Sequence, residues 1–221
     1  MKKVLIATVS VAFLFAFFGC RHLGKAVQGS GVRKTEKREL AAFKSIETNG
    51  AFEIKITCQQ PQSFEIEGDD NILPLIKTEI RDGVLHIHNE KSYNSARLSS
   101  IRIGLADLNR FATEGAADVS ITNIKNDKFS INSTGAAKIK VEGQTKLVEI
   151  NVPGAAKIDA SNLRAERAAV TVNGAAQVDV YASQQLDAIV AGVGQVTYDG
   201  NPGVVNQNVT GLGRVNKKGS N

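Results

Sequence analysis

The sequence is poor in aromatic residues, and this scarcity limits how its core can be built. Aromatic side chains make up 5% of the 221 residues, and tryptophan is absent. Val, Ile, Leu and Ala must therefore supply most of the buried surface. A chain of this length is enough for one ordinary domain and too short for two comfortable ones. The 20 glycines and four prolines imply many turns, without the strict three-residue period of a collagen.

Cysteine is also scarce, which argues against a disulfide-stabilised fold. The two cysteines are Cys20 and Cys58, and Cys20 closes an N-terminal targeting segment. Cys58 follows the alternating stretch FEIKIT, so we expect a small buried or half-buried thiol at the end of a strand. Stability must then come from packing and backbone pairing.

The long apolar run of the chain lies at its N-terminus and predicts export. VLIATVSVAFLFAFF is about fifteen residues long, whereas a membrane-spanning helix needs roughly twenty. Lys2 and Lys3 precede this run and Gly19 ends it, so residues 1–19 are predicted to be a signal peptide.

The four residues that end this segment, Phe17-Phe18-Gly19-Cys20, resemble the lipobox of bacterial lipoproteins, with Phe17 where leucine is usual. The resemblance implies cleavage before Cys20, lipidation of Cys20, and a membrane partner reached through that lipid. Arg21 provides no acidic retention signal for the inner membrane, which favours an outer-membrane lipoprotein on its periplasmic or surface face. A plain secretory signal with an incidental Cys20 is the alternative.

Charge of one sign does not dominate the mature chain. Without Lys2 and Lys3, 25 basic residues stand against 22 acidic ones, a formal charge of +3. The basic residues cluster in 33–38 (RKTEKR), after the stretch GKAVQGSG, so we interpret residues 20–38 as the lipidated N-terminus and a flexible tether. No basic face interleaved with aromatics is present, so a nucleic acid is not an expected partner.

A repeat of about 19 residues occupies the second half of the chain. Glycines at 115, 135, 154, 174, 192 and 211 are spaced by 20, 19, 20, 18 and 19 residues, and most begin a Gly-Ala-Ala triplet. Four residues after each glycine an aliphatic residue recurs, at Val119, Ile139, Ile158, Val178, Val196 and Val215. Such self-similarity at a fixed period is typical of solenoid folds.

The alternation within each repeat predicts strands rather than helices. Each period offers about three short β segments, before the glycine, after it, and near Leu147, Leu163 or Leu186. We therefore predict an all-β fold, a right-handed parallel β-helix with coils of about 19–20 residues, in a single domain over 39–221. Gly-Ala-Ala would form the tight corner of each coil, with residues 200–221 as the final coil.

The pattern also extends towards the N-terminus. Gly50 is followed by Ile54 and Ile56, and the 65 residues to Gly115 leave room for about three longer coils, with FEIEG, VLHIHN and SIRIGL as strands. The stretch 68–83 predicts a turn or short helix with Asp70 or Asn71 as its N-cap.

The string FKSIETNGAFEIKI, followed by GDDNILPLI, DGVLHI and the GAA repeats, resembles the putative auto-transporter adhesin head GIN domain family over residues 27–217. The resemblance implies an exported, often lipid-anchored β-helical envelope protein with no catalytic residues.

The outward positions of the repeats hold the candidate ligand-facing residues. Three and five residues after the corner glycines stand Lys138, Lys140, Lys157, Asp159 and Asp179. The lysines favour an acidic ligand, so the first hypothesis is a non-catalytic adhesin that binds a glycan or an envelope or surface protein. Asp159 and Asp179, about one coil apart, leave open a polysaccharide-active enzyme. A purely structural assembly role is the third possibility, and the sequence does not fix the oligomeric state.

No metal or cofactor is expected. His86, His88 and Glu90 alternate along one strand, but three groups spaced along a strand rarely converge on one ion, so a solvated face is the simpler interpretation. The GDDN stretch at 68–71 lacks the remaining ligands of a calcium loop, and no nucleotide-binding motif or nucleophile elbow occurs.

Overall fold

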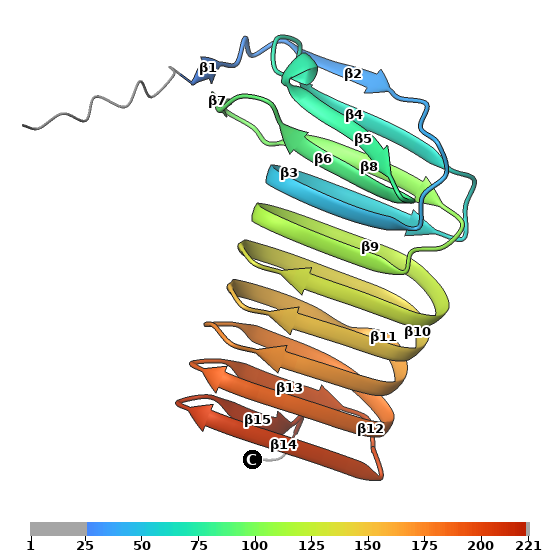
Figure 1. Ribbon diagram of the computed structural model, residues 1–221, viewed down its shortest axis with the longest axis vertical. Helices are drawn as coiled ribbons and strands as arrows, with labels where there is room; N and C mark the ends of the chain where they lie inside the picture. The colour runs from blue at the N-terminus through green and yellow to red at the C-terminus, as the bar shows by residue number, and fades with distance from the viewer. Residues whose placement is uncertain (1–25, 220–221) are drawn as a thin grey trace, which may run out of the picture.

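The computed structural model describes residues 26–219, which are almost entirely β-structure (Figure 1). Thirteen strands form one large, mostly parallel sheet in the order β15-β13-β12-β11-β10-β9-β3-β8-β4-β2, with β14, β5 and β6 joined at its sides, and β1 pairs with β7. The elements are β1 (Val27–Gln28), β2 (Arg33–Lys37), β3 (Ser45–Cys58), β4 (Ser63–Asp69), the 3-10 helix η1 (Leu73–Leu75), β5 (Ile76–Arg81), β6 (Val84–Asn89), β7 (Tyr93–Asn94), β8 (Ser99–Leu105), β9 (Arg110–Ser133), β10 (Ala136–Val152), β11 (Ala155–Val172), β12 (Gln177–Gly192), β13 (Gln195–Asp199), β14 (Val204–Gly211) and β15 (Arg214–Lys217).

Successive repeats pair in parallel and place equivalent aliphatic residues side by side. Ile139 lies opposite Val119 on one side and Ile158 on the other, and Ile158 lies opposite Val178. All four side chains are at most 1% exposed. The same column continues to Ile54 and Ile101 at one end and through Val196 to Val215 at the other. The predicted lining-up of the repeats in neighbouring layers is confirmed, and these columns form the core.

The strands are longer than the sequence predicted. Instead of three short segments per repeat, β9 to β12 run for 16 to 24 residues each and bend without leaving the sheet. The bends show as shifts in register, between Val141 and Gly143 in the pairing of β10 with β9. Because each repeat bends where its neighbour bends, backbone hydrogen bonds continue through the turn and no separate strands result.

The corner glycines stack directly on one another. A Cβ atom on Gly135 would lie 2.1 Å from the carbonyl oxygen of Gly115, and one on Gly174 would lie 2.1 Å from that of Gly154. Positive φ angles occur at Gly115 and Gly211 but not at Gly135 or Gly174. Glycine is therefore required at the middle corners by the close approach of two backbones, and not by the dihedral angles that the sequence argument invoked.

Residues between β3 and β9 form a cap and not three further coils. Gly50 pairs directly with Gly115, although 65 residues separate them, so β3 is the layer immediately before β9. On the other side of β3, its first half pairs with β6 and its second half with β8, both parallel. Antiparallel partners then close this end, with β5 on β6, β4 on β8, and β2 on β4. The predicted strands FEIEG, VLHIHN and SIRIGL are present, but as parts of this cap.

The expectation of a flexible tether up to residue 38 is wrong for residues 26–38. β2 pairs antiparallel with β4, from Arg33 opposite Asp69 to Lys37 opposite Glu65. The Asn71 side chain anchors the preceding residues, since it accepts a hydrogen bond from the Ser30 N–H (2.9 Å) and donates one to the Gln28 carbonyl (2.8 Å). Residues 28–37 are therefore part of the folded unit. The predicted signal peptide and Cys20 lie outside the described residues.

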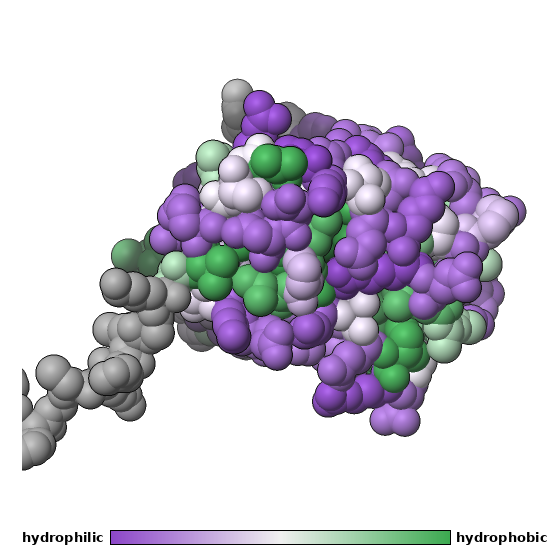
Figure 2. All heavy atoms as spheres, turned by 90° about the horizontal axis from the view of Figure 1, so that it is seen from above, coloured by the Kyte–Doolittle hydropathy of each residue, from purple (hydrophilic) through white to green (hydrophobic). Residues whose placement is uncertain are grey.

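The short helix η1 is also capped differently from the prediction. Its N-cap is Ile72, without a side-chain hydrogen bond, rather than Asp70 or Asn71. Both polar side chains are used elsewhere, because the Asp70 carboxylate accepts a 2.6 Å hydrogen bond from the Ser30 hydroxyl, while Asn71 anchors the N-terminal segment. Figure 2, which looks onto this end of the stack, shows hydrophilic side chains over most of it with apolar ones between them.

Cys58 lies in the core with no exposed surface and is a free thiol. Burial, assisted by the nearby Asp107 carboxylate, raises the pKa of the thiol to about 12. As expected from its position, the residue serves as a small apolar side chain rather than as a reactive group.

Candidate functional site

The five residues predicted to face a ligand lie side by side on one face of the sheet. Lys138 is opposite Lys157, Lys140 is opposite Asp159, and Asp159 is opposite Asp179. They lie in the first parts of β10, β11 and β12, which follow the corner glycines.

Neighbouring side chains already bond most of these charges. The Lys140 ammonium lies 2.7 Å from a Glu142 carboxylate oxygen, which raises the pKa of Lys140. Lys138 lies 3.9 Å from Asp118, and Asp179 accepts a 3.3 Å hydrogen bond from Gln177. The three lysines of this ladder of charges are exposed, whereas Asp159 and Asp179 are half-buried and line a hollow of about 270 Å³. Exposed ion pairs such as those of the lysines contribute little to stability.

Asp159 is held in its ionised form. It accepts hydrogen bonds from the Ser161 hydroxyl (2.6 Å) and the Ser161 backbone N–H (3.1 Å). These bonds, with the positive charge of Lys140 as a smaller cause, lower the pKa of Asp159. A glycosidase needs one carboxyl group that stays protonated to act as the acid, so Asp159 is unsuited to that role.

We expect the substitution Ser161→Ala to raise the pKa of Asp159 towards its ordinary value. The change removes the hydroxyl that bonds the charged form while leaving the backbone N–H in place. Since the native pKa is lowered, the stabilisation it provides is present above the unfolded-state pKa and disappears as the pH falls through the native value. A carboxyl NMR titration of both forms measures the shift; an unchanged Asp159 titration would show that the hydroxyl is not its cause.

A polar hollow on another part of the sheet was not predicted from the sequence. It has a volume of about 260 Å³ and is lined by residues of β3, β6 and β9, chiefly Glu47, His86, His88, Arg110, Ala112, Glu114 and Asn132. Ala112 is opposite Glu47 in the register and is 8% exposed. Because its side chain is short where the neighbouring positions carry long ones, Ala112 forms the floor of the hollow.

Glu47 organises one wall of the hollow. One of its carboxylate oxygens accepts a 2.5 Å hydrogen bond from the Arg110 guanidinium, and the other lies 3.4 Å from Nδ1 of His86. On the next column, Glu114 accepts a hydrogen bond from Asn49 (3.1 Å). Charged and amide groups of both hydrogen-bonding types thus converge on one small concave surface.

The histidines do not form the set that their spacing suggested. His86 and His88 both line the hollow, whereas Glu90 pairs with Lys77 at 3.3 Å. Within residues 26–219, no group of three or more His, Cys, Asp or Glu side chains is placed to hold a metal ion. The sequence could not reveal the hollow, because Glu47 and Arg110 are 63 residues apart and meet only through the direct pairing of β3 with β9.

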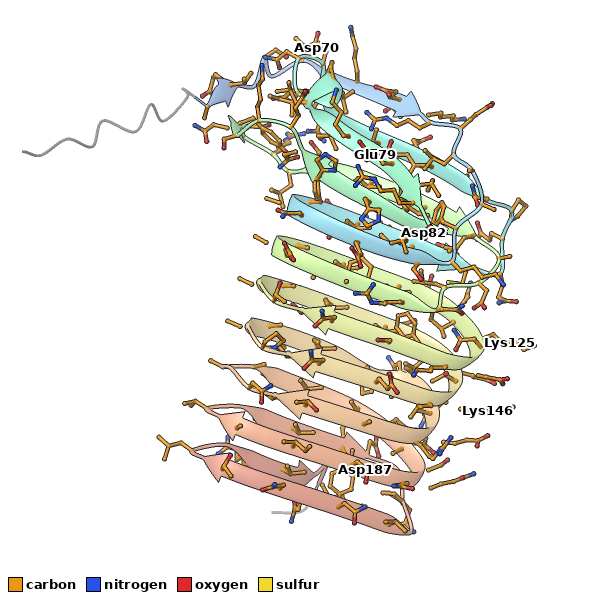
Figure 3. The ribbon with its side chains drawn as sticks, viewed as in Figure 1. Asp70, Glu79, Asp82, Lys125, Lys146 and Asp187 are labelled. Carbon is orange, nitrogen blue, oxygen red and sulfur yellow. The ribbon has the colours of Figure 1, made fainter. Side chains whose placement is uncertain are left out.

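The bend opposite the glycine column carries a third polar surface. Lys125 and Lys146 project from the stack there (Figure 3), and Lys146 lies 2.8 Å from Asp127, which raises the pKa of Lys146. The Arg164 guanidinium lies over the Tyr181 ring, 4.3 Å from its centre. The side chains that form these contacts also line a broad hollow of about 670 Å³ on this bend.

The fold and these surfaces define a stacked all-β protein with polar outer faces. Residues 42–202 match the family described as "Putative auto-transporter adhesin, head GIN domain", and the chain belongs to this family. The description of the family as an adhesin implies a place at the cell surface or in the envelope. In the described residues, no helix is long and apolar enough to span a membrane.

Solved structures share the fold. A "putative adhesin" from Bacteroides fragilis is 24% identical, with a TM-score of 0.69, over 87% of this chain and all of that one. A "putative lipid binding protein" from Parabacteroides distasonis is 20% identical, with a TM-score of 0.54, over 87% and 99% of the two chains. A "putative adhesin" from Parabacteroides merdae is 17% identical, with the same TM-score, over 87% and 98%. At these identities the likeness concerns the fold alone, and no curated protein matches the sequence.

Proposed function

We propose that this protein is a non-catalytic, ligand-binding adhesin of the cell envelope, built as a right-handed parallel β-helix and anchored by a lipid on Cys20. The crossover connection between two parallel strands of one sheet is right-handed in nearly all proteins, which supports a right-handed β-helix. The signal-like residues 1–19 and the Phe17–Cys20 motif support export and an outer-membrane anchor.

The observation that carries the binding function is the polar hollow over Ala112. It gathers charged and amide groups of three strands over one short side chain, whereas Lys138, Lys140 and Lys157 lie along the paired strands β10 and β11. From the hollow, a column of amide and hydroxyl side chains continues across the next repeats, since Asn151 lies opposite both Asn132 and Thr171 and donates a 3.1 Å hydrogen bond to Asn132. A polar, extended ligand can bind in the hollow and follow this column.

The chemistry of the lining favours a hydroxyl-rich or acidic ligand such as a glycan chain. Arg110, His86 and Asn132 offer donors, while Glu47 and Glu114 offer acceptors. Repeated contacts along the column supply avidity without a deep pocket. A polysaccharide-cleaving activity is the weaker alternative, because Asp159 is held ionised and would leave the role of the acid to Asp179 alone.

The test uses the chain from residue 21 on, which contains all described residues, and a panel of defined acidic and neutral glycans. We expect binding that falls about tenfold or more in Ala112→Gln, because the longer side chain fills the hollow. Lys138→Gln with Lys157→Gln tests the ladder, and Lys125→Gln at the remote bend is the matched control. Equal binding by the wild type and Ala112→Gln removes the hollow from the site; binding to no glycan contradicts the glycan ligand.

The anchor and the location need separate measurements. Metabolic labelling with a fatty acid should mark the wild-type protein and not Cys20→Ser. Protease treatment of intact cells should digest a surface-exposed domain and spare a periplasmic one, and sparing would contradict adhesion to other cells.

A further inference from the structure

The two ends of the stack differ in how their edge strands are protected. The large sheet of residues 26–219 has four edge strands. β2 and β5 lie at the N-terminal end of the stack, and β14 and β15 lie at the other end (Figure 1). β2 (RKTEK), β5 (IKTEIR) and β15 (RVNK) each carry at least two charged residues, the usual guard against edge-to-edge pairing. β14 reads VVNQNVTG and carries none.

Exposed apolar side chains gather at the same end. Eight large hydrophobic residues are exposed among residues 26–219, and six of them lie between residues 189 and 212, namely Ile189, Val193, Val204, Val205, Val209 and Leu212. Leu212, directly after β14, is 86% exposed. Val205 and Val209 continue the interior columns of Leu186 and Val190, and no further layer of the described chain covers them. Clustered exposure of this kind marks an interaction surface.

The sequence of β14 is complementary to itself. Residues 205–209 read Val-Asn-Gln-Asn-Val, a palindrome centred on Gln207. When two copies of such a strand pair antiparallel about a twofold axis at Gln207, each Val205 meets a Val209, each Asn206 meets an Asn208, and the two glutamines meet each other. The same register brings Leu212 of one copy opposite Pro202 of the other, so the most exposed leucine also gains an apolar neighbour.

We propose that β14 is a dimerisation edge, through which two copies of this chain join end to end by antiparallel pairing centred on Gln207. The pairing extends the sheet across the two stacks, covers the last interior valines and satisfies the free backbone groups of the edge. Asn206 stays available on the outer face, where it donates a 2.7 Å hydrogen bond to Asp187, the residue labelled beside β14 in Figure 3.

The positive charge near β15, the other edge strand at this end of the stack, limits the strength of the dimer. Residues 200–219 contain three basic side chains, Arg214, Lys217 and Lys218, and no acidic one. Lys218 lies 3.7 Å from Asp199, which offsets part of this positive charge. Two copies brought end to end still bring like charges together near β15. Because these basic residues are exposed, salt screens their repulsion, and the dimer should tighten as the salt concentration rises.

A charge-exchange experiment tests the register. Gln207 is exposed in the single chain, so both Gln207→Lys and Gln207→Glu can fold. We expect the wild-type chain from residue 21 on to sediment as a dimer, each variant alone to dissociate about tenfold more readily, and an equimolar mixture of the two to recover dimers. Thr35→Lys, on the exposed edge strand β2 at the opposite end, is the matched control and should leave the dimer intact.

A cross-link provides an independent check of the same axis. Directly opposed residues of antiparallel strands have Cα atoms about 4.5–5.5 Å apart, which suits a disulfide. Gln207→Cys should therefore form a covalent dimer on mild oxidation, while Cys58 stays buried and Thr35→Cys gives no such product. A wild-type chain that is monomeric at all concentrations and salt levels, open-ended oligomers, or dimers that neither charge at 207 weakens would each overturn the proposal.

Discussion

The substitution Gly135→Ala is expected to destabilise the protein by about 3 kcal/mol or more. The added Cβ would lie 2.1 Å from the oxygen and 2.4 Å from the nitrogen of Gly115, and both are backbone atoms. The backbone cannot move aside freely, because the Gly135 carbonyl accepts a 3.1 Å hydrogen bond from Ala155 in the next repeat. Urea unfolding, followed by circular dichroism, measures the loss.

Gly203→Ala is the matched control, because the nearest atom to its added Cβ would be 4.0 Å away and its φ is not positive. We expect that change to alter the free energy of unfolding by no more than about 0.5 kcal/mol. A Gly135→Ala protein as stable as Gly203→Ala would show that the corner column can spread apart, and that close approach does not explain the recurring glycine.

The corner glycines also show which features of the fold the sequence could predict and which it could not. The repeat of glycine and aliphatic residues predicted which positions would share a layer, and the pairing of Ile139 with Val119 and Ile158 confirms it. Spacing alone could not tell whether glycine was needed for its dihedral angles or for its missing side chain, because that depends on the distance between neighbouring backbones. Likewise, it could not show that bent strands remain continuous.

The N-terminal region was harder to predict because its pairing ignores sequence order. Between Gly50 and Gly115 the repeat is absent, so the alternating strands could be found but their partners could not. The antiparallel pairing of β2 with β4 turned a supposed tether into part of the fold. The hollow depends on this same region, since Glu47 of β3 meets Arg110 of β9 through the direct pairing of these strands, and β6 of the cap adds His86.

The second large effect is expected from Ile139→Ala, at about 2–5 kcal/mol. Ile139 is fully buried and lies between Val119 and Ile158 in the middle of the stack. With no tryptophan and no disulfide among the described residues, these aliphatic columns are the main source of stability, so a cavity in one of them is not compensated elsewhere. The midpoint of urea unfolding should fall accordingly.

Lys138, the outward-facing neighbour of Ile139, provides a control that separates the loss of buried surface from the mere loss of side-chain atoms. Lys138→Ala removes more atoms than Ile139→Ala, yet it should change the free energy of unfolding by no more than about 0.5 kcal/mol, since Lys138 is exposed and its ion pair with Asp118 is long, at 3.9 Å. We expect the urea slope of Ile139→Ala to match that of the wild type, because β10 shares backbone hydrogen bonds with both β9 and β11 and cannot unfold alone. Equal losses at 138 and 139 would mean that the stacked aliphatic interior does not hold this protein together.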